Sequence, residues 1–163
     1  MYSDLLGVEL TINLMNGGTM QNTIKREISI HAPKERVYAA ITDQKQITSW
    51  FPDTIEGTLS EGERPLFVFE GHGKSQIYVV KMQPHDYFAF RWIPGGSDFV
   101  GDVLSKPNTL VEFQIEESNG VCKVIMTESG FASLPTEVAE TSFKQNDNGW
   151  TYMLDRLEKH FKD

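Results

Sequence analysis

Hydrophobic and polar residues alternate in several segments of the chain, and this pattern predicts strands. Residues 24–30 carry isoleucine at even spacing, and residues 65–71 alternate in the same way. Residues 74–92 predict two strands that are joined at a turn rich in Pro and Asp. Residues 108–131 predict a hairpin, because an Asn-Gly pair of the kind that favours a tight turn divides two alternating runs.

Three other segments predict helices. Pro33 suits the first turn of a helix over residues 31–43, and residues 44–51 predict a second short helix that ends before Pro52. No proline interrupts residues 136–161, and their spacing predicts one helix of roughly 25 residues, about 38 Å long. The face of this helix that we expect to be buried consists of Phe143, Asn146, Trp150, Met153, Leu157 and Phe161.

The order of these elements predicts an α+β fold. One strand is followed by two short helices, then by about six antiparallel strands and one long helix that lies on the sheet. The length of 163 residues suits one domain with a sizeable core. We expect this domain to span residues 23–163. Residues 1–22 form an N-terminal extension, which is either an added strand or disordered, and we read no signal peptide in it.

Charge and cysteine content narrow the classes of partner. Lys and Arg number 15 against 23 Asp and Glu, a net charge of −8, which argues against nucleic acid and against an anionic membrane surface. The one cysteine, Cys122, excludes an intrachain disulfide, and a reducing compartment such as the cytoplasm is the simplest interpretation. No apolar run approaches the roughly 18 residues of a membrane span.

The sequence offers little catalytic or metal-binding chemistry. Its four histidines fall in separate elements without metal-ligand spacing, so we expect no metal site, no cofactor and no catalytic set. Cys122 follows the Asn-Gly turn and is interpreted as a small apolar residue rather than a nucleophile. The word GHGKS at 71–75 resembles the end of a phosphate loop, but Val68 stands where that loop needs glycine.

Three residues leave alternatives open. Glu128 shares a strand face with Val124 and Met126, so it either enters the interior or lies in water near the strand end. We favour the exposed position, because glutamate is seldom buried. Asn146 and Gly149 are unusual on the inner side of a helix. They suit either a mostly apolar pocket with few polar groups or a close helix–sheet approach with Asn146 bonded to backbone.

Five stretches, in order, resemble one known family. They are residues 28–43, 47–51, 79–92, 124–131 and 146–161. The chain resembles a START-like (SRPBCC, helix-grip) domain of the family named for the activator of the 90-kDa heat-shock protein ATPase. This resemblance implies a curved antiparallel sheet of about six to seven strands that grips the C-terminal helix, with a cavity between them. The family's name also implies a role in a stress response.

The resemblance directs attention to the residues that would line such a cavity. The adjacent rings of Trp50 and Phe51 precede Pro52 at one mouth of the expected cavity, and we predict that one is structural and the other faces the cavity. The cavity candidates are Trp50, Phe51, Phe67, Phe69, Tyr78, Phe88, Phe90, Trp92, Phe113, Met126, Glu128, Phe131, Asn146, Gly149, Trp150 and Met153.

Three functions follow as hypotheses. The leading one is non-enzymatic binding of a small hydrophobic or amphipathic ligand between sheet and helix. The alternative is a protein module that interacts with a chaperone, as an ATPase activator does, or with another protein. An enzyme of the cyclase or hydrolase kind is the least favoured, because no acid/base or nucleophile set was found. We expect a monomer or a homodimer.

Overall fold

The computed structural model describes residues 22–94 and 98–162, so most of the expected N-terminal extension lies outside the described residues. The strands are β1 (Thr23–Ile30), β2 (Thr54–Glu56), β3 (Leu66–Phe69), β4 (Gly73–Gln76), β5 (Tyr78–Gln83), β6 (Tyr87–Trp92), β7 (Thr109–Ser118) and β8 (Val121–Ser129). The helices are α1 (Lys34–Thr42), α2 (Gln44–Ile47) and α3 (Thr136–His160), with short 3-10 turns η1 (Val103–Ser105) and η2 (Phe131–Ser133).

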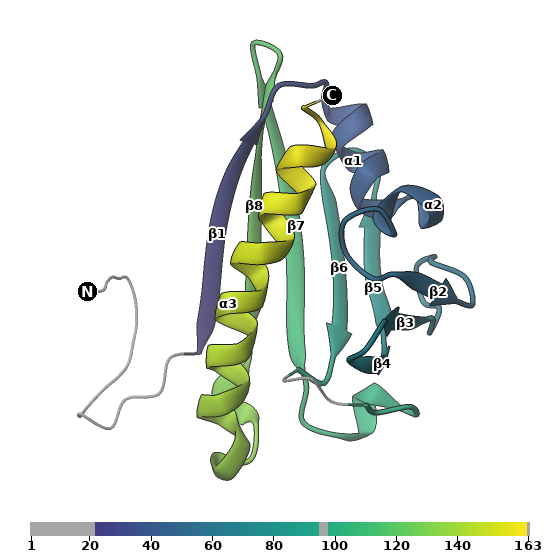
Figure 1. The fold of residues 1–163 in the computed structure, drawn as a ribbon, viewed down its shortest axis with the longest axis vertical. Helices are drawn as coiled ribbons and strands as arrows, with labels where there is room; N and C mark the ends of the chain where they lie inside the picture. Colours follow the sequence, from purple (N-terminus) through teal and green to yellow (C-terminus); the bar gives the residue numbers. More distant parts are fainter. Residues whose placement is uncertain (1–21, 95–97, 163) are drawn as a thin grey trace, which may run out of the picture.

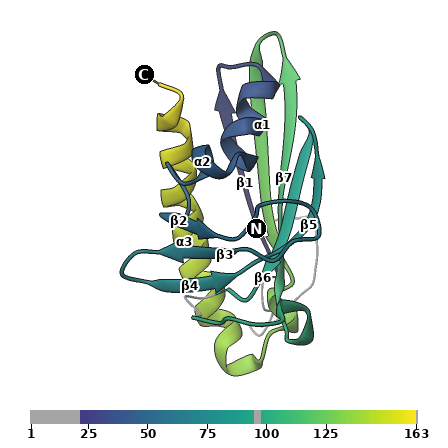
Figure 2. The same ribbon diagram turned by 90° about the vertical axis from the view of Figure 1, so that its right-hand side faces the viewer.

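The strands form two antiparallel sheets, and the α+β fold class is confirmed. The larger sheet has five strands in the order β1-β8-β7-β6-β5, and the smaller has three in the order β2-β3-β4. Figure 1 shows α3 lying lengthwise over one face of the larger sheet, and Figure 2 shows the smaller sheet crossing beside it. Sheet, smaller sheet and long helix therefore surround a common interior.

The part of residues 74–92 before the Pro/Asp turn was expected to form a single strand, and this was wrong. The segment divides into β4 and β5, which belong to different sheets. Ile77 lies between them; its side chain is fully buried and its N–H donates to the carbonyl of Pro65 at 3.0 Å. Alternation alone cannot show such a change of sheet, because the side chains continue to alternate through it. The pattern also missed β2, whose three residues are too few to show a period.

The hairpin of β7 and β8 is confirmed. Its turn residues Asn119 and Gly120 have φ of 54° and 79°, the left-handed values that a primed two-residue turn requires. The register pairs Ser118 with Val121 and places Phe113 opposite Met126. These pairs keep the alternating apolar residues of both strands on the face that meets α3.

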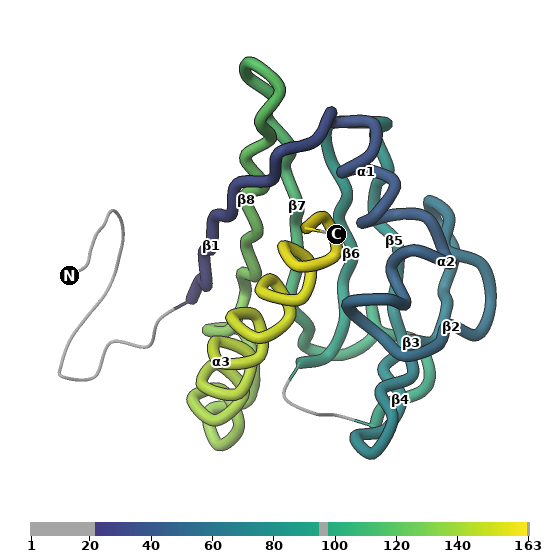
Figure 3. Tube along the Cα trace, turned by 45° about the horizontal axis from the view of Figure 1, so that its top comes forward, coloured from purple at the N-terminus to yellow at the C-terminus, as the bar shows by residue number. Residues whose placement is uncertain are grey.

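The long helix is confirmed, and its buried face is rotated slightly from the expected one. Figure 3 shows α3 crossing in front of the larger sheet. The residues of α3 that are buried are Ala139, Ser142, Trp150, Leu154 and Leu157. Phe143, Asn146, Met153 and Phe161, which were expected to face inward, are half-buried and flank that line. This rotation leaves one side of α3 facing the smaller sheet.

The short helices are held by local hydrogen bonds. The Asp43 carboxylate accepts from the Gln46 N–H at 3.0 Å and caps α2. This helix is shorter than the expected segment 44–51, and residues 48–50 continue it as a turn. The chain then passes into Phe51 and Pro52 with both side chains buried.

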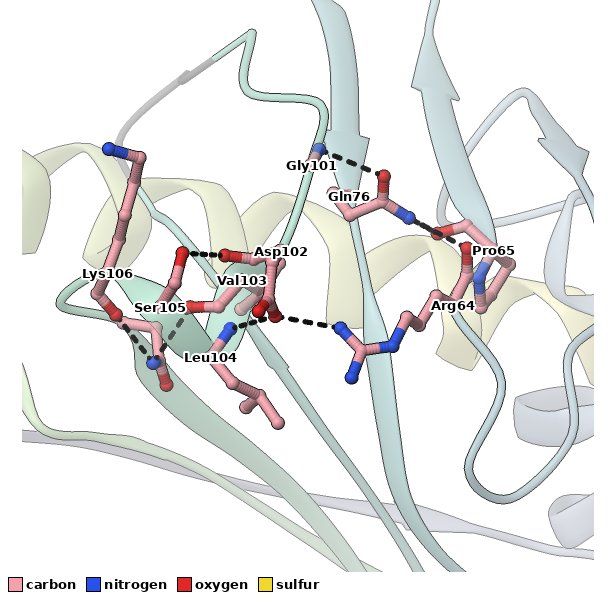
Figure 4. A network of polar contacts seen from close by, with 10 residues as sticks. Arg64, Pro65, Gln76, Gly101, Asp102, Val103, Leu104, Ser105 and Lys106 are labelled. Carbon is pink, nitrogen blue, oxygen red and sulfur yellow. Dashed lines mark hydrogen bonds and ion pairs between the residues drawn. The ribbon is translucent and has the colours of Figure 1, made fainter.

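A polar network fastens the loop after β6 to the smaller sheet (Figure 4). The Arg64 guanidinium donates to Asp102 at 2.8 Å, which holds the pKa of that exposed carboxyl below its ordinary value. Gln76 donates to the carbonyl of Arg64 at 2.7 Å and accepts from the Gly101 N–H at 3.2 Å. These bonds fix β4 against the segment that connects β6 to β7.

None of the helices in the described part of the chain combines the length and the apolar character that a membrane-spanning helix requires.

Candidate functional site

A cleft of about 450 Å³ lies where the smaller sheet, the end of β6 and α3 meet. We call it the aromatic cleft. Its lining consists of Phe51, Phe69, His72, Ser75, Trp92, Ile93, Pro94, Gln145, Asn146, Gly149, Trp150, Tyr152 and Met153. Most of these side chains are apolar, and a few polar groups are placed among them, which is the composition of small-molecule sites.

The two rings of the Trp50–Phe51 pair have different surroundings. Trp50 is fully buried and its indole N–H donates to the carbonyl of Ala40 at 2.8 Å, so it fastens the turn after α2 to α1. Phe51 lines the aromatic cleft and is almost fully buried. The rings stack on one another with centroids 5.3 Å apart. Trp50 therefore supports, from behind, the ring that reaches the cleft.

Four rings form the aromatic wall of the cleft. The centroid of Phe51 lies 5.2 Å from that of Trp150, 5.8 Å from that of Trp92 and 5.6 Å from that of Phe69. Trp92 and Trp150 are 6.1 Å apart and tilted by 38°. These rings come from the turn after α2, β3, β6 and α3, so elements distant in sequence supply one continuous aromatic surface.

Glu128 corrects the favoured expectation, because it is fully buried rather than exposed. It lies on β8 between Val111 of β7 and Ile24 of β1. Its side chain joins Val124 and Met126 on the inner face and ends directly behind the wall of the aromatic cleft. Glutamate is rarely buried without a partner, so its hydrogen bonds decide whether this position is stable.

Four side chains donate hydrogen bonds to the Glu128 carboxylate. The indole N–H of Trp92 and the hydroxyl of Thr109 reach Oε2 at 2.9 Å and 2.6 Å. The indole N–H of Trp150 reaches Oε1 at 2.8 Å, and the Asn146 amide N–H₂ lies 2.9 Å and 3.0 Å from the two oxygens. Indole and amide N–H groups can only donate, and an ionised carboxylate only accepts, so this arrangement suits the ionised form.

Three of the four donors of this carboxylate are also cleft residues. Trp92, Asn146 and Trp150 all line the aromatic cleft and all bind Glu128. Among the described residues, no Lys or Arg lies within ion-pair distance of it. One buried carboxylate thus holds three wall residues from β6 and α3 in place, and the negative charge lies one side chain behind the cleft surface.

The structure places fourteen of the sixteen expected cavity residues in two regions, and Glu128 and Tyr78 lie outside both. Those in the cleft lining are Phe51, Phe69, Trp92, Asn146, Gly149, Trp150 and Met153. Those in the packed core are Trp50, Phe67, Phe88, Phe90, Phe113, Met126 and Phe131. Glu128 lies behind the wall, and Tyr78 packs against the Arg64 guanidinium, whose Cζ lies 4.9 Å from the ring centroid.

Sequence reasoning missed several members of the site. The lining residues not expected are His72, Ser75, Ile93, Pro94, Gln145 and Tyr152, and the Glu128 donor not expected is Thr109. Tyr152 is an aromatic residue of α3, two positions after Trp150, and this was the one available signal. Ser75 lies on β4 and His72 in the turn between β3 and β4, and no local pattern indicates the position of this smaller sheet over the helix.

The remaining reactive side chains lie elsewhere. Cys122 is buried and its Sγ lies 3.2 Å from the carbonyl of Ala32; burial raises the pKa of its thiol above the ordinary value. His160 Nδ1 lies 3.0 Å from the Ser49 hydroxyl. Within residues 22–94 and 98–162, no group of three metal-ligating side chains could hold a metal ion. The aromatic cleft is therefore the candidate site that combines volume, shape and placed polar groups.

A smaller cleft of about 240 Å³ lies between β1 and α3. Arg26 borders it and forms an ion pair with Asp147 on α3. Both partners are partly exposed, so the pair contributes little to stability. This cleft has no aromatic wall.

Solved structures with the same fold are numerous, and no curated protein matches the chain. MLL2253 from Mesorhizobium loti has a TM-score of 0.69 at 18% identity, covering 85% of this chain and 95% of that one. The Aha1 dimer from Colwellia psychrerythraea has a TM-score of 0.68 at 20% identity, covering 87% and 97%. These identities show that the fold is shared.

A third similar structure comes from a biosynthetic locus. DynU16, a protein in the dynemicin biosynthetic locus, has a TM-score of 0.69 at 21% identity, and the match covers 86% of this chain. It covers 47% of DynU16, so this chain spans about half of that protein's length. The model of the family described as "Activator of Hsp90 ATPase homolog 1-like protein" matches residues 31–162, which include the smaller sheet, α3 and strands β5 to β8 of the larger sheet. The chain belongs to this family.

Proposed function

We propose that this protein binds a small hydrophobic or amphipathic molecule in the aromatic cleft without transforming it. The observation that carries the proposal is a cleft of about 450 Å³ walled by Phe51, Phe69, Trp92 and Trp150. This volume falls within the range of about 300–1,000 Å³ that is usual for small-molecule sites. Large aromatic surfaces supply most of the binding free energy of an apolar ligand.

The walls of the cleft are pre-organised, which favours binding. Glu128 fixes both indoles and the Asn146 amide before a ligand arrives, so little side-chain entropy is lost on association. Gly149 leaves open space on the helix side, because a Cβ built there meets no atom within 4 Å. A side chain at this position would occupy part of the cleft.

The hydrogen bonds of Glu128, the buried carboxylate beside the cleft, favour binding over catalysis. Glu128 already accepts hydrogen bonds from four side chains, so its lone pairs are committed to the wall. A general acid or base needs a lone pair or proton directed at the substrate. The carboxylate acts on the cleft through the residues that it holds.

The test uses a fluorescent hydrophobic probe and a panel of lipids and metabolites. Trp92 and Trp150 line the cleft, so a ligand there changes the intrinsic fluorescence as well as the thermal stability of the protein. Gly149→Phe fills the cleft and should abolish binding. Asn148→Phe is the matched control, because Asn148 is the exposed neighbour of Gly149 on α3 and is not part of the cleft lining.

Two results would overturn the proposal. One is that no compound in the panel shifts the unfolding temperature or quenches the tryptophans. The other is binding that persists unchanged in Gly149→Phe, which would place the ligand elsewhere on the molecule.

A chaperone-interacting role is the second candidate, supported by membership of a family named for the activator of the Hsp90 ATPase. Under this candidate the protein acts in a stress response and changes the ATPase rate of that chaperone. Pull-down and an ATPase assay with the purified chaperone test it, and an unchanged rate at high excess of this protein rejects it.

The oligomeric state and the compartment are separate expectations. Size-exclusion chromatography with light scattering decides between a monomer and a homodimer. Cys122, buried and single, is consistent with a reducing compartment such as the cytoplasm.

A further inference from the structure

The polar groups of the aromatic cleft are not evenly balanced between donors and acceptors. The Asn146 amide directs its N–H₂ at both oxygens of Glu128, at 2.9 Å and 3.0 Å. The opposite orientation would bring a carbonyl oxygen against a carboxylate, so the charge fixes which way the amide points. Its Oδ1 is therefore turned away from Glu128 and accepts no hydrogen bond from the described residues. Because Asn146 lines the aromatic cleft, this oxygen is the free acceptor that its side chain can offer a ligand.

The indole rings also favour a positively charged ligand. A positive charge is attracted to the face of an aromatic ring, and tryptophan is the strongest partner. Both indole N–H groups donate to the same anion, and such a bond polarises the donor and enriches its ring in electrons. Trp92 and Trp150 thus present more negative faces than they would with water as the N–H partner.

Charges around the cleft do not oppose this preference. No Lys or Arg is among the described residues that line it. The Glu128 carboxylate lies directly behind Trp92, Asn146 and Trp150 and has no cationic partner among the described residues. The chain as a whole carries a net charge of −8. An anionic ligand would be repelled by the same charges that attract a cation.

We infer that the aromatic cleft takes a hydrophobic amine in its protonated form, with the ammonium over the indole faces and an N–H donated to Asn146 Oδ1. This inference rests on the proposed ligand-binding function and names the chemical class of its ligand. The apolar body of the amine packs on Phe51 and Phe69, which supply the remaining aromatic wall.

The test compares three ligands that share one apolar body and differ in the head group: phenylbutylamine, phenylbutanol and phenylbutyrate. Affinities for the wild-type protein are measured by calorimetry and tryptophan fluorescence at neutral pH, where the amine is a cation. We expect the amine to bind roughly fivefold or more tighter than the alcohol, and the carboxylate to bind weakest. Equal or tighter binding of the alcohol overturns the inference and leaves the proposed function standing. Binding of none of the three, with none of the fluorescent probe, rejects the proposed function and the inference together.

Variants of Glu128 and Trp92 test whether these residues cause the preference for the amine over the alcohol. In Glu128→Gln the ratio of alcohol to amine dissociation constants should fall towards one. Glu112→Gln is the matched control, because Glu112 lies on the adjacent β7 outside the cleft, and it should keep the wild-type ratio. Trp92→Phe retains a ring but not the N–H, so it should lower the ratio even where Glu128→Gln fails to fold. A ratio unchanged in Trp92→Phe and in Glu128→Gln overturns the inference.

Discussion

The indole N–H of Trp150, on the long C-terminal helix, donates to the carboxylate of Glu128, on strand β8 between β1 and β7, at 2.8 Å. Both side chains are buried. The bond joins the helix to the inner face of the larger sheet, where apolar contacts are the usual link between a helix and a sheet. It fixes the helix in register with the strand, because the indole has only one N–H and that N–H must meet the carboxylate.

Removing the Glu128 carboxylate should destabilise the protein strongly. Glu128→Ala leaves the buried donors of Trp92, Thr109 and Trp150, and the half-buried amide of Asn146, without their acceptor. Each buried group of this kind costs about 1–3 kcal/mol. We therefore expect the free energy of unfolding to fall by at least about 3 kcal/mol, measured by urea denaturation. Glu116→Ala, at an exposed position on β7, is the control and should change stability by less than about 0.5 kcal/mol. A small effect at Glu128 would mean that water replaces the carboxylate in the cavity left behind.

Trp50→Ala should lower the free energy of unfolding by about 3–5 kcal/mol, as a large-to-small change in a packed core does. Trp50→Phe keeps most of the ring but leaves the Ala40 carbonyl without the donor that reaches it at 2.8 Å, at a cost of about 1 kcal/mol or more. Chemical denaturation of both variants checks the order. If Trp50→Ala abolished ligand binding with little loss of stability, Trp50 would be a gate to the cleft.

The sequence could predict the elements that depend on local signals, but not the surroundings of Glu128, which come from distant parts of the chain. The Asn119-Gly120 turn, the alternation of β7 and the proline-free run of α3 are local signals, and all three elements formed as expected. The position of Glu128 is set by Trp92, Thr109, Asn146 and Trp150, which lie 36, 19, 18 and 22 residues away from it. No local pattern contains such a set.

The same reason accounts for the part of the cleft that was missed. Phe51, Trp92 and Trp150 were expected, because aromatic residues on inner faces are visible in the sequence. Ser75 and the turn residue His72 come from β4 and the β3–β4 connection of the smaller sheet, which is separate because the chain changes sheets at Ile77. The alternation predicts which side of a strand is apolar; it does not predict which sheet receives the strand.

Gly149→Ala should stabilise the protein by about 0.5–1 kcal/mol. Gly149 lies inside α3, an added Cβ meets no atom within 4 Å, and alanine is the better helix former by roughly this amount. Gly130→Ala is the contrasting variant, because Gly130 has φ of 105° and its added Cβ would lie 3.3 Å from the carbonyl oxygen of Asn108. It should destabilise. Thermal denaturation of the two variants should give shifts of opposite sign, and a loss of stability in Gly149→Ala would show that the open space is needed by the fold.

The environment of Tyr87 leads us to expect that the stability of the protein falls as the pH rises in the alkaline range. Burial, and then the hydrogen bond that its hydroxyl donates to Glu112, raise the pKa of the phenol above its ordinary value near 10. The group therefore contributes stability that is fully present below about pH 10 and is lost as the pH rises towards the folded-state value. Tyr87→Phe should cost about 1 kcal/mol at neutral pH, and this difference from wild type should shrink in strong alkali. Tyr152→Phe, at a position 61% exposed, is the control and should show no such change with pH.

Urea denaturation across the pH range measures the difference in stability between Tyr87→Phe and wild type. Ultraviolet absorbance should show that Tyr87→Phe lacks the tyrosine that deprotonates only at high pH. If that component persisted in Tyr87→Phe, it would belong to Tyr38, whose pKa burial also raises.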